Sequence, residues 1–293
     1  MTTQAVAVRS GALADYVELT KPRITLMVMF TALLGYLLAG APGAWSAPAL
    51  VSALVGTGLV AAGASALNMV LERDSDARML RTRLRPLPAG RLRPIEATGF
   101  GLLLALAGLL QLLYFSGALA AQVAFVTWAS YVFVYTPLKS RTSLATIVGA
   151  VPGALPPVIG WAAAGGTLDG GAWVLFAILF LWQIPHFLAI AWLYRDDYER
   201  GGFPMLPVID RDGRLTGRQA VLHSLALLLV SLAPGATGMA GPWAFWGAAA
   251  CGLALCAVAL RLALRRSLPA ARLLFLASLV YLPALSLLLL LDR

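Results

Sequence analysis

The chain has 293 residues, of which 60% are hydrophobic and only 12% are charged, and its mean hydropathy is +0.83. This composition excludes an ordinary soluble domain and indicates a protein with several membrane-spanning helices. The formal net charge of +9 comes from arginines in short loops beside the predicted helices. That placement favours contact with the lipid bilayer and argues against nucleic acid as a partner.

Apolar runs of roughly 20 residues, the length that crosses a bilayer, predict nine transmembrane helices. They cover residues 22-40, 47-70, 95-115, 118-137, 143-165, 172-194, 218-238, 242-262 and 271-291. We expect these helices to form one all-α membrane domain over residues 1-293, in which residues 1-20 are a short segment ahead of the first helix.

The positions of the basic residues support this helix count. Arginines and lysines occupy the amino-terminal segment and every second loop, whereas the loops between them have none and only Arg293 falls on the other side. The positive-inside rule then places the amino terminus, together with both acidic segments described below, in the cytoplasm. Residues 1-20 show neither a cleavable signal nor a long transit peptide, so we expect a bacterial cytoplasmic (inner) membrane.

A first group of acidic residues follows the second predicted helix. Carboxylates at the end of a membrane helix are costly to dehydrate and usually mark an ion or substrate site. If the helix continues, at about 100° per residue, Asn68, Glu72 and Asp76 share one face. Asp74 lies on the opposite side, where it can pair with Arg78. The oxygen-rich face suits a hard cation such as Mg²⁺, although a solvated helix end would show the same periodicity.

Basic residues near this segment match the chemistry of phosphate. Arg81 and Arg85 follow it directly in a Pro/Gly-containing loop, and a guanidinium fork fits phosphate oxygens. Lys139 closes the fourth predicted helix shortly after Tyr135. A lysine there is usually an interface anchor, but it also provides a point charge for a phosphate.

A second acidic segment follows the sixth predicted helix, where Asp196 and Asp197 lie between Tyr194 and Tyr198. If that helix continued unbroken, His186 would lie at nearly the same azimuth as Asp197, two to three turns deeper in the membrane. A buried histidine is more often a core residue than a ligand, so both roles stay open for His186.

Several motifs occur in a defined order between residues 16 and 290. They are Asn68-x3-Glu72-Arg-Asp74-x-Asp76, Arg81-Thr-Arg-x-Arg-Pro-x-Pro-Ala-Gly, Tyr135-Thr-Pro-Leu-Lys139 and Gly149-Ala-Val-Pro-Gly-Ala-Leu-Pro156-Pro157. This arrangement resembles the intramembrane, UbiA-type prenyltransferase superfamily. Two further motifs, Trp182-Gln-Ile-Pro-His186-Phe and the segment from Tyr194 to Pro207, resemble the branch of that superfamily that farnesylates haem.

The resemblance implies a nine-helix barrel of the UbiA type, open sideways to lipid. The implied substrates are farnesyl diphosphate and haem B (protohaem IX), the implied product is haem O, and haem A synthase is the implied partner downstream. The resemblance implies that Mg²⁺ is held by catalytic residues Asn68, Glu72, Asp76, Asp196 and Asp197. It implies substrate contacts from Arg81, Arg85, Tyr135, Lys139, His186, Tyr194 and Tyr198.

This chain departs from the superfamily pattern at two places. Glu72 stands where aspartate is usual, and Tyr194 and Tyr198 stand where the broader superfamily has acids. The tyrosine-flanked form resembles the haem-modifying branch. There, the imidazole of His186 would ligate haem iron or hydrogen-bond a propionate.

Two other functions remain open at this point. A prenyltransferase for a quinone-precursor phenol would share the first acidic motif but would not be expected to contain the motif around His186. An ion-coupled secondary transporter would more often place its charges near the bilayer midplane and show inverted repeats. Diphosphate release that depends on added haem separates all three.

Overall fold

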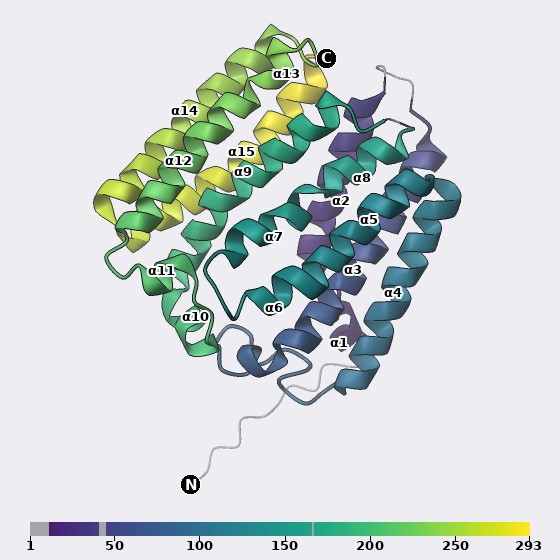
Figure 1. Ribbon diagram of the computed structural model, residues 1–293, viewed down its shortest axis with the longest axis vertical. Coiled ribbons are helices and arrows are strands. Elements are labelled where there is room, and N and C mark those ends of the chain that lie inside the picture. Colours follow the sequence, from purple (N-terminus) through teal and green to yellow (C-terminus); the bar gives the residue numbers. More distant parts are fainter. Residues whose placement is uncertain (1–11, 41–44, 166) are drawn as a thin grey trace.

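The computed structural model describes residues 12–40, 45–165 and 167–293, and within these ranges the chain is helical and contains no strand (Figure 1). Nine helical segments of the described chain are long and apolar enough to span a membrane, which confirms the predicted number. They are α2 (Pro22–Ala39), α3 (Ala47–Asp76), α4 (Pro94–Phe115), α5 to α6 (Ala118–Leu138), α7 to α8 (Ala145–Ala163), α9 (Gly170–Leu193), α12 to α13 (Arg214–Ala236), α14 (Pro242–Arg265) and α15 (Leu268–Leu291).

Three of these segments are interrupted. The fourth consists of α5 (Ala118–Ala129), the π-helical turn η1 (Ser130–Tyr135) and α6 (Thr136–Leu138). The fifth divides into α7 (Ala145–Ala154) and α8 (Pro156–Ala163), and the seventh into α12 (Arg214–Ser231) and α13 (Ala233–Ala236). The short helices α1 (Ala12–Leu19), α10 (Arg195–Gly201) and α11 (Leu206–Ile209) lie outside the spans.

The helices form two groups that flank a central region (Figure 1). Helices α2 to α8 make up one group, in which α3 packs along α4 and α2 packs along α8. In the other group, α14 packs against α12 and α15, and α9 packs against the same two helices. Helix α9 also contacts α7, so it joins the two groups.

Glycines allow the tightest of these contacts, between α2 and α8. A Cβ atom on Gly35 would lie 1.9 Å from the carbonyl oxygen of Pro157, and one on Gly160 would lie 1.8 Å from that of Ala32. Small residues drive association in membrane helices because they let backbones approach closely. The Gly35 and Gly160 contacts therefore hold α2 beside the broken α7–α8 span.

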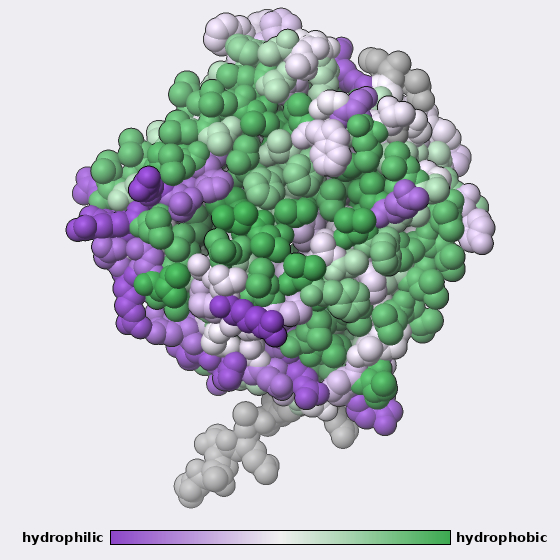
Figure 2. All heavy atoms as spheres, viewed as in Figure 1, coloured by the Kyte–Doolittle hydropathy of each residue, from purple (hydrophilic) through white to green (hydrophobic). Residues whose placement is uncertain are grey.

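Polar residues gather at one end of the molecule. In Figure 1 that end contains α1, the α3–α4 loop, α10 and α11, and the opposite end contains α13 and the carboxyl terminus. Figure 2 shows hydrophilic residues along the same edge and hydrophobic residues over most of the rest of the visible face. We call this edge the charged end. Both acidic segments lie there, as the loop pattern predicts.

Helix α9 ends before the second acidic segment. Leu193 is its last residue, and Tyr194 leaves the helical region at φ −115° and ψ 27° before α10 begins at Arg195. This end lies within one residue of the predicted end at 194, so the condition of an unbroken helix from His186 to Asp197 is not met. The backbone change at Tyr194 sets the direction of the second acidic segment independently of α9.

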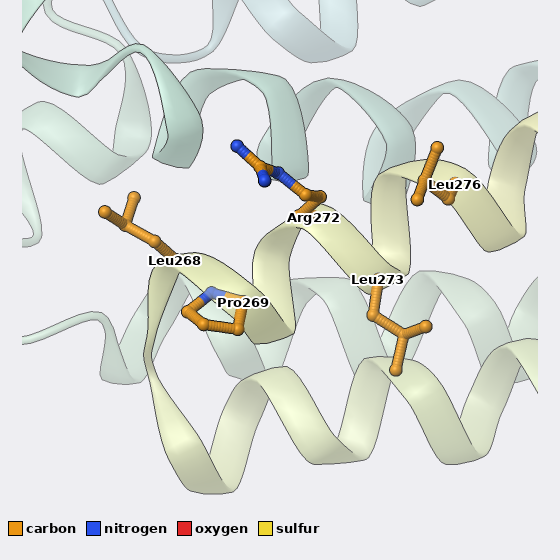
Figure 3. A pocket seen from close by; sticks show the side chains of 5 residues that line it. All are labelled: Leu268, Pro269, Arg272, Leu273 and Leu276. Atoms are coloured by element: carbon orange, nitrogen blue, oxygen red, sulfur yellow. The ribbon is translucent and has the colours of Figure 1, made fainter.

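A hollow of about 350 Å³ lies on the first turns of α15 (Figure 3). Its lining residues are Leu268, Pro269, Arg272, Leu273 and Leu276. Arg272 is the one charged residue in its lining, so the hollow provides mainly apolar contacts and no set of reactive groups.

Candidate functional site

The face of α3 predicted to be rich in oxygen is buried inside the molecule. Helix α3 continues to Asp76, and Asn68, Glu72 and Asp76 are only 2%, 6% and 0% exposed. Asp74 points away from them, with 86% of its side chain exposed. The helical-phase argument therefore separates these residues correctly.

The predicted ion pair between Asp74 and Arg78 is wrong. Asp74 pairs with its neighbour Arg73 at 3.1 Å. Arg78 instead donates hydrogen bonds to Ser75 and, at 2.8 Å, to the carbonyl oxygen of Gly201 on α10. The pairing at i+4 requires a continuing helix, and α3 ends at Asp76.

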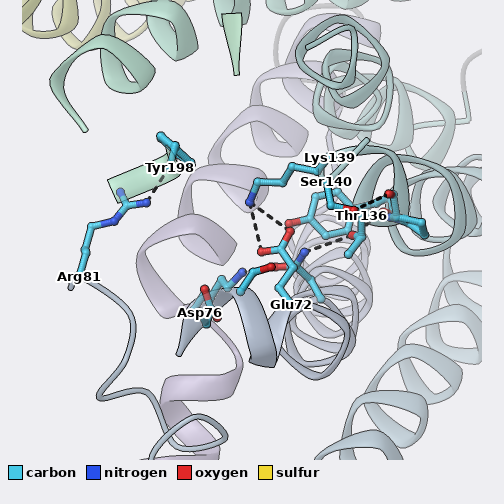
Figure 4. A network of polar contacts seen from close by, with 12 residues as sticks. Glu72, Asp76, Arg81, Thr136, Lys139, Ser140 and Tyr198 are labelled. Atoms are coloured by element: carbon cyan, nitrogen blue, oxygen red, sulfur yellow. Dashed lines mark hydrogen bonds and ion pairs between the residues drawn. The ribbon is translucent and has the colours of Figure 1, made fainter. Parts of the chain in front are cut away.

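Two lysines bind Asn68 and Glu72 on this face. Lys139 Nζ lies 3.1 Å from both carboxylate oxygens of Glu72, and Lys21 Nζ donates to Asn68 Oδ1 at 2.6 Å (Figure 4). Burial lowers the pKa of Lys21 to about 8, an effect that the Glu72 carboxylate partly opposes. Burial also disfavours charged Lys139, but the Glu72 carboxylate raises the pKa of Lys139 above its ordinary value.

Asp76 is only half satisfied. Its Oδ2 accepts a hydrogen bond from Arg85 Nη1 at 2.8 Å. Its Oδ1 is buried and has no hydrogen-bond partner. An orphaned carboxylate oxygen in a buried site is costly, and a hard cation is one ligand that would satisfy it.

The π-helical turn η1 orients the groups opposite α3. Thr136 donates to the carbonyl oxygen of Tyr131, five residues back, and its hydroxyl oxygen accepts from Asn68 Nδ2 at 3.1 Å. The rings of Tyr131 and Tyr135 lie 5.3 Å apart. A π-turn shifts the side chains beyond it around the helix, and such turns are frequent at functional sites. Here the turn precedes Lys139 and contributes to its approach to Glu72.

Asp197 binds the loop after α3. Its carboxylate accepts from the backbone amides of Leu80 at 2.8 Å and Arg81 at 3.2 Å, and from Arg200 Nη2 at 2.7 Å. Burial would raise the pKa of Asp197, but Arg200 and the two amides outweigh burial and hold that pKa below its ordinary value. The structure thus joins the two acidic segments through hydrogen bonds from Asp197 to a loop.

The other acid of the second segment points away from this cluster. Asp196 has 82% of its side chain exposed, and its nearest cation is Arg195 at 3.9 Å. In the ranges that the structure describes, no three His, Cys, Asp or Glu side chains gather as a metal cluster. The five predicted ligands therefore occupy three places: the α3 face, the α3–α4 loop contact and the surface.

The aromatic side chains of the second segment contact cations. The Arg81 guanidinium lies 4.7 Å from the ring centre of Tyr194 and 5.6 Å from that of Tyr198. Lys139 Nζ lies 4.5 Å from the ring centre of Phe203. Figure 4 shows Arg81 meeting Tyr198 apart from the Glu72–Lys139 pair. Arg81 and Arg85, predicted to act together, therefore lie in different surroundings.

His186 is buried between aromatic rings of α9 and α15. It stacks on Trp182 with ring centres 4.8 Å apart, and Phe275 lies 5.3 Å away. Its Nδ1 is 2.8 Å from Ser278 Oγ, which donates its own proton to the carbonyl oxygen of Phe275. If Ser278 keeps that bond, its hydroxyl has no second proton to give, so Nδ1 of a neutral ring would be the donor and Nε2 would have the lone pair.

Three contacting residues escaped the sequence analysis. Lys21 belongs to the basic amino-terminal segment and is not among the predicted site residues, Arg200 is not among them either, and Ser278 lies in an apolar run. Lys21 is one of two non-glycine residues with positive φ in the described chain, a feature that sequence cannot display. The i,i+3 spacing of Asp197 and Arg200 was the one available signal.

Comparisons with known proteins agree with this architecture. Residues 28–280 match the model of the UbiA prenyltransferase family. A protein named protoheme IX farnesyltransferase from Solibacter usitatus (strain Ellin6076) is 48% identical over 288 residues, which cover 95% of this chain and 98% of the relative. A protein of the same name from Koribacter versatilis (strain Ellin345) is 43% identical, with 99% of this chain and 98% of the relative covered.

Solved structures share the fold at low identity. A digeranylgeranylglyceryl phosphate synthase structure is 17% identical and superposes with a TM-score of 0.80, covering 96% of this chain and 98% of that chain. A UbiA homolog from Archaeoglobus fulgidus bound to GPP and Mg²⁺ is 14% identical, with a TM-score of 0.67 and coverages of 94% and 99%. At these identities the likeness shows the fold.

Proposed function

The chain belongs to the UbiA prenyltransferase family, and from that premise we propose the reaction it performs. It transfers the farnesyl group of farnesyl diphosphate to a vinyl group of protohaem IX (haem B), adds water and gives haem O and diphosphate. The proposal rests on one observation above all: relatives named protoheme IX farnesyltransferase match almost the whole chain at 42–48% identity. A phenol prenyltransferase or a transporter is not favoured by these relatives.

The α3 face fits a magnesium ion. Asp76 has a buried oxygen without a partner, and Glu72 and Asn68 present oxygens on the same face. Carboxylate and amide oxygens together with substrate phosphates are the ligands that Mg²⁺ prefers. When bound, the ion would neutralise charge that develops on the leaving diphosphate. A solved UbiA homolog bound to GPP and Mg²⁺ supports the use of Mg²⁺ on this fold.

We assign Asp196 and Asp197 other roles than direct ligation. The Asp197 carboxylate already accepts three hydrogen bonds from this chain. It therefore acts by holding the α3–α4 loop, and with it Arg85, beside the α3 face. Asp196 faces the surface. The ligand set we propose is accordingly Asn68, Glu72 and Asp76.

The cations of the site supply contacts to the diphosphate. Lys21, Lys139 and Arg85 each bind a different residue of the α3 face: Asn68, Glu72 and Asp76, respectively. These three cations outnumber the two carboxylates of the face, so the cluster has net positive charge and attracts an anion. Once substrate is bound, the lysine ammonium groups turn from Glu72 and Asn68 to phosphate oxygens. They stabilise the departing group as the allylic C–O bond breaks.

Aromatic residues lie close to the site where the farnesyl cation would form. A vinyl carbon is a weak nucleophile, so alignment of the two substrates contributes more than a base. Tyr131, Tyr135 and Phe203 lie near the Glu72–Lys139 pair, and aromatic rings at this place would stabilise the developing allylic cation. They also exclude water from it until the vinyl group has attacked.

We propose that His186 binds haem iron. With Nδ1 as the donor to Ser278, Nε2 would offer a lone pair to the iron and would have no proton for a propionate. Of the two roles considered for His186, the hydrogen-bond arrangement favours iron ligation. Trp182 and Phe275 fix the ring plane.

In this proposal the protein lies in a bacterial inner membrane, with the charged end on the cytoplasmic side. Its arginine-rich loops satisfy the positive-inside rule, and the product passes to an enzyme such as haem A synthase. Both substrates are lipophilic, so they reach the site from the bilayer.

The test is a reconstitution of the purified chain in vesicles. We expect diphosphate release from farnesyl diphosphate that requires both haem B and Mg²⁺, with haem O identified by mass. Release stimulated by a quinone-precursor phenol instead of haem would replace the proposed acceptor. No release, together with ion-driven uptake of a solute, would replace the enzymatic proposal altogether.

A further inference from the structure

A second polar region at the charged end is separate from the α3 face. It is a cavity of about 630 Å³ between α10, the α3–α4 loop and the turn that joins α14 to α15. Its charged lining residues are Arg81, Arg195, Asp196, Asp197, Arg200 and Arg266. Apolar lining comes from Leu80, Trp192, Leu193 and Leu268. We call it the arginine cavity.

The arginine cavity has more basic than acidic side chains, and not every arginine has a carboxylate partner. Arg200 pairs with Asp197 at 2.7 Å, and Arg195 lies 3.9 Å from Asp196. In the part of the chain that the structure describes, no carboxylate pairs with the other two guanidiniums, Arg81 and Arg266. The cavity therefore has two solvent-exposed guanidiniums without a carboxylate partner beside an apolar wall, which suits an amphiphile with two acidic groups.

Arg266 occupies a strained backbone position. It follows the last turn of α14 with φ 45° and ψ 46°, in the left-handed region where glycine is favoured. Its guanidinium reaches only the carbonyl oxygen of Asp212, at 3.5 Å. A helix end of this kind gains from glycine, so the backbone conformation alone does not account for the arginine.

The cavity also lies within reach of the proposed iron ligand. Leu193 and His186 are seven residues apart on α9, which places them on nearly the same side of the helix and about 10 Å apart along its axis. That separation is comparable to the distance from the iron of a haem to its propionates. Leu268 belongs to both the cavity and the hollow on α15 (Figure 3), so apolar surface continues toward the membrane.

From these observations we infer that the arginine cavity binds the two propionates of the porphyrin substrate, with Arg81 and Arg266 as their counter-ions. The inference rests on the proposed function, because it assigns a place to the acceptor of that reaction. It divides the basic residues by substrate. Arg85 and the two lysines face the diphosphate, and Arg81 and Arg266 face the porphyrin.

The experiment compares haem B with haem dimethyl ester, in which both carboxylates are capped, by Soret titration of the purified protein in detergent. Arg266→Gly removes the guanidinium and relieves the backbone, so the variant folds. We expect it to weaken haem binding roughly tenfold or more, to leave ester binding unchanged, and to leave the KM for farnesyl diphosphate unchanged. Arg266→Lys should lose less affinity. Arg265→Ala, which removes the same charge from the neighbouring residue that does not line the cavity, should match the wild type.

Three results would overturn the inference. Equal haem affinity in wild type and Arg266→Gly would remove Arg266 from the site. Equal weakening of haem and its ester would assign Arg266 to packing. A raised KM for farnesyl diphosphate with unchanged haem affinity would make the cavity a phosphate site. Failure of the proposed function is separate, since the wild-type protein would then release no diphosphate in response to haem.

Discussion

Asp76→Asn tests the central assignment, because it removes a charge at nearly constant volume. In the native protein Asp76 is fully buried, binds Arg85 at 2.8 Å through one oxygen and has no partner for the other. The amide oxygen of asparagine can still accept from Arg85. The free oxygen that we assign to Mg²⁺, however, is replaced by an NH₂ group that repels a cation.

The expected loss of stability is moderate. A hydrogen bond to a charged group contributes about 1.5–3 kcal/mol, and Arg85 keeps 25% of its side chain exposed, so solvent compensates part of the lost charge. We therefore expect a loss toward the lower end of that range. The larger Asp76→Ala change would also leave Arg85 without its partner, so this site does contribute to folding and alanine is the poorer probe.

The expected loss of activity is much larger. Removing one group that stabilises developing charge lowers kcat by about 10²–10³-fold, and the variant should need more Mg²⁺ for half-maximal diphosphate release. Asp74→Asn is the matched control, since Asp74 belongs to the same helix but is exposed and pairs only with Arg73. Its activity and thermal unfolding should equal those of the wild type. An active Asp76→Asn protein with an unchanged Mg²⁺ requirement would refute the metal assignment, and an inactive Asp74→Asn protein would refute the helical-phase argument.

Three other predictions follow from neighbouring contacts. Glu72→Gln should shift the Mg²⁺ titration to higher concentration while Glu72→Asp stays active, and identical titration curves for wild type and Glu72→Gln would remove this residue from the site. Arg200→Ala should speed hydrogen exchange in the peptide that contains Leu80, because it weakens the Asp197 contact that holds this amide; unchanged exchange would mean that the loop is held by other contacts. His186→Ala should lose haem-dependent turnover and the Soret signature of a nitrogen-ligated iron, while a farnesyl diphosphate analogue still binds with Mg²⁺. An unchanged Soret spectrum in that variant would return His186 to the core.

Sequence reasoning succeeded where the structure is local and periodic. The phase of α3 follows from 3.6 residues per turn, so the separation of Asp74 from Glu72 and Asp76 could be derived without coordinates. The nine spans follow from hydrophobic length, and the shared end of the two acidic segments follows from loop charge.

The remaining features depend on tertiary contacts or on small backbone changes. The start of a separate helix, α10, at Arg195 has no glycine or proline before it to indicate the break. The contacts of Lys21 with Asn68 and of Ser278 with His186 join residues far apart in sequence. The periodicity of a single helix does not predict such pairs, and the sequence does not predict the left-handed backbone conformation of Lys21 either.

The pairing of acids with lysines explains how this site can remain buried before substrate arrives. An isolated carboxylate at the depth of Glu72 would be costly to dehydrate, and Lys139 supplies the opposite charge within 3.1 Å of both oxygens. Binding a metal and a diphosphate requires no new desolvated charge from the protein. In the proposed site, the Glu72 carboxylate would exchange the Lys139 ammonium for the metal, and that ammonium would exchange the carboxylate for a phosphate. A lysine is suited to this exchange because its point charge and flexible stem tolerate both partners. Lys139→Arg, with a rigid planar fork, should therefore bind the diphosphate yet turn over slowly, and wild-type kcat in that variant would contradict the exchange.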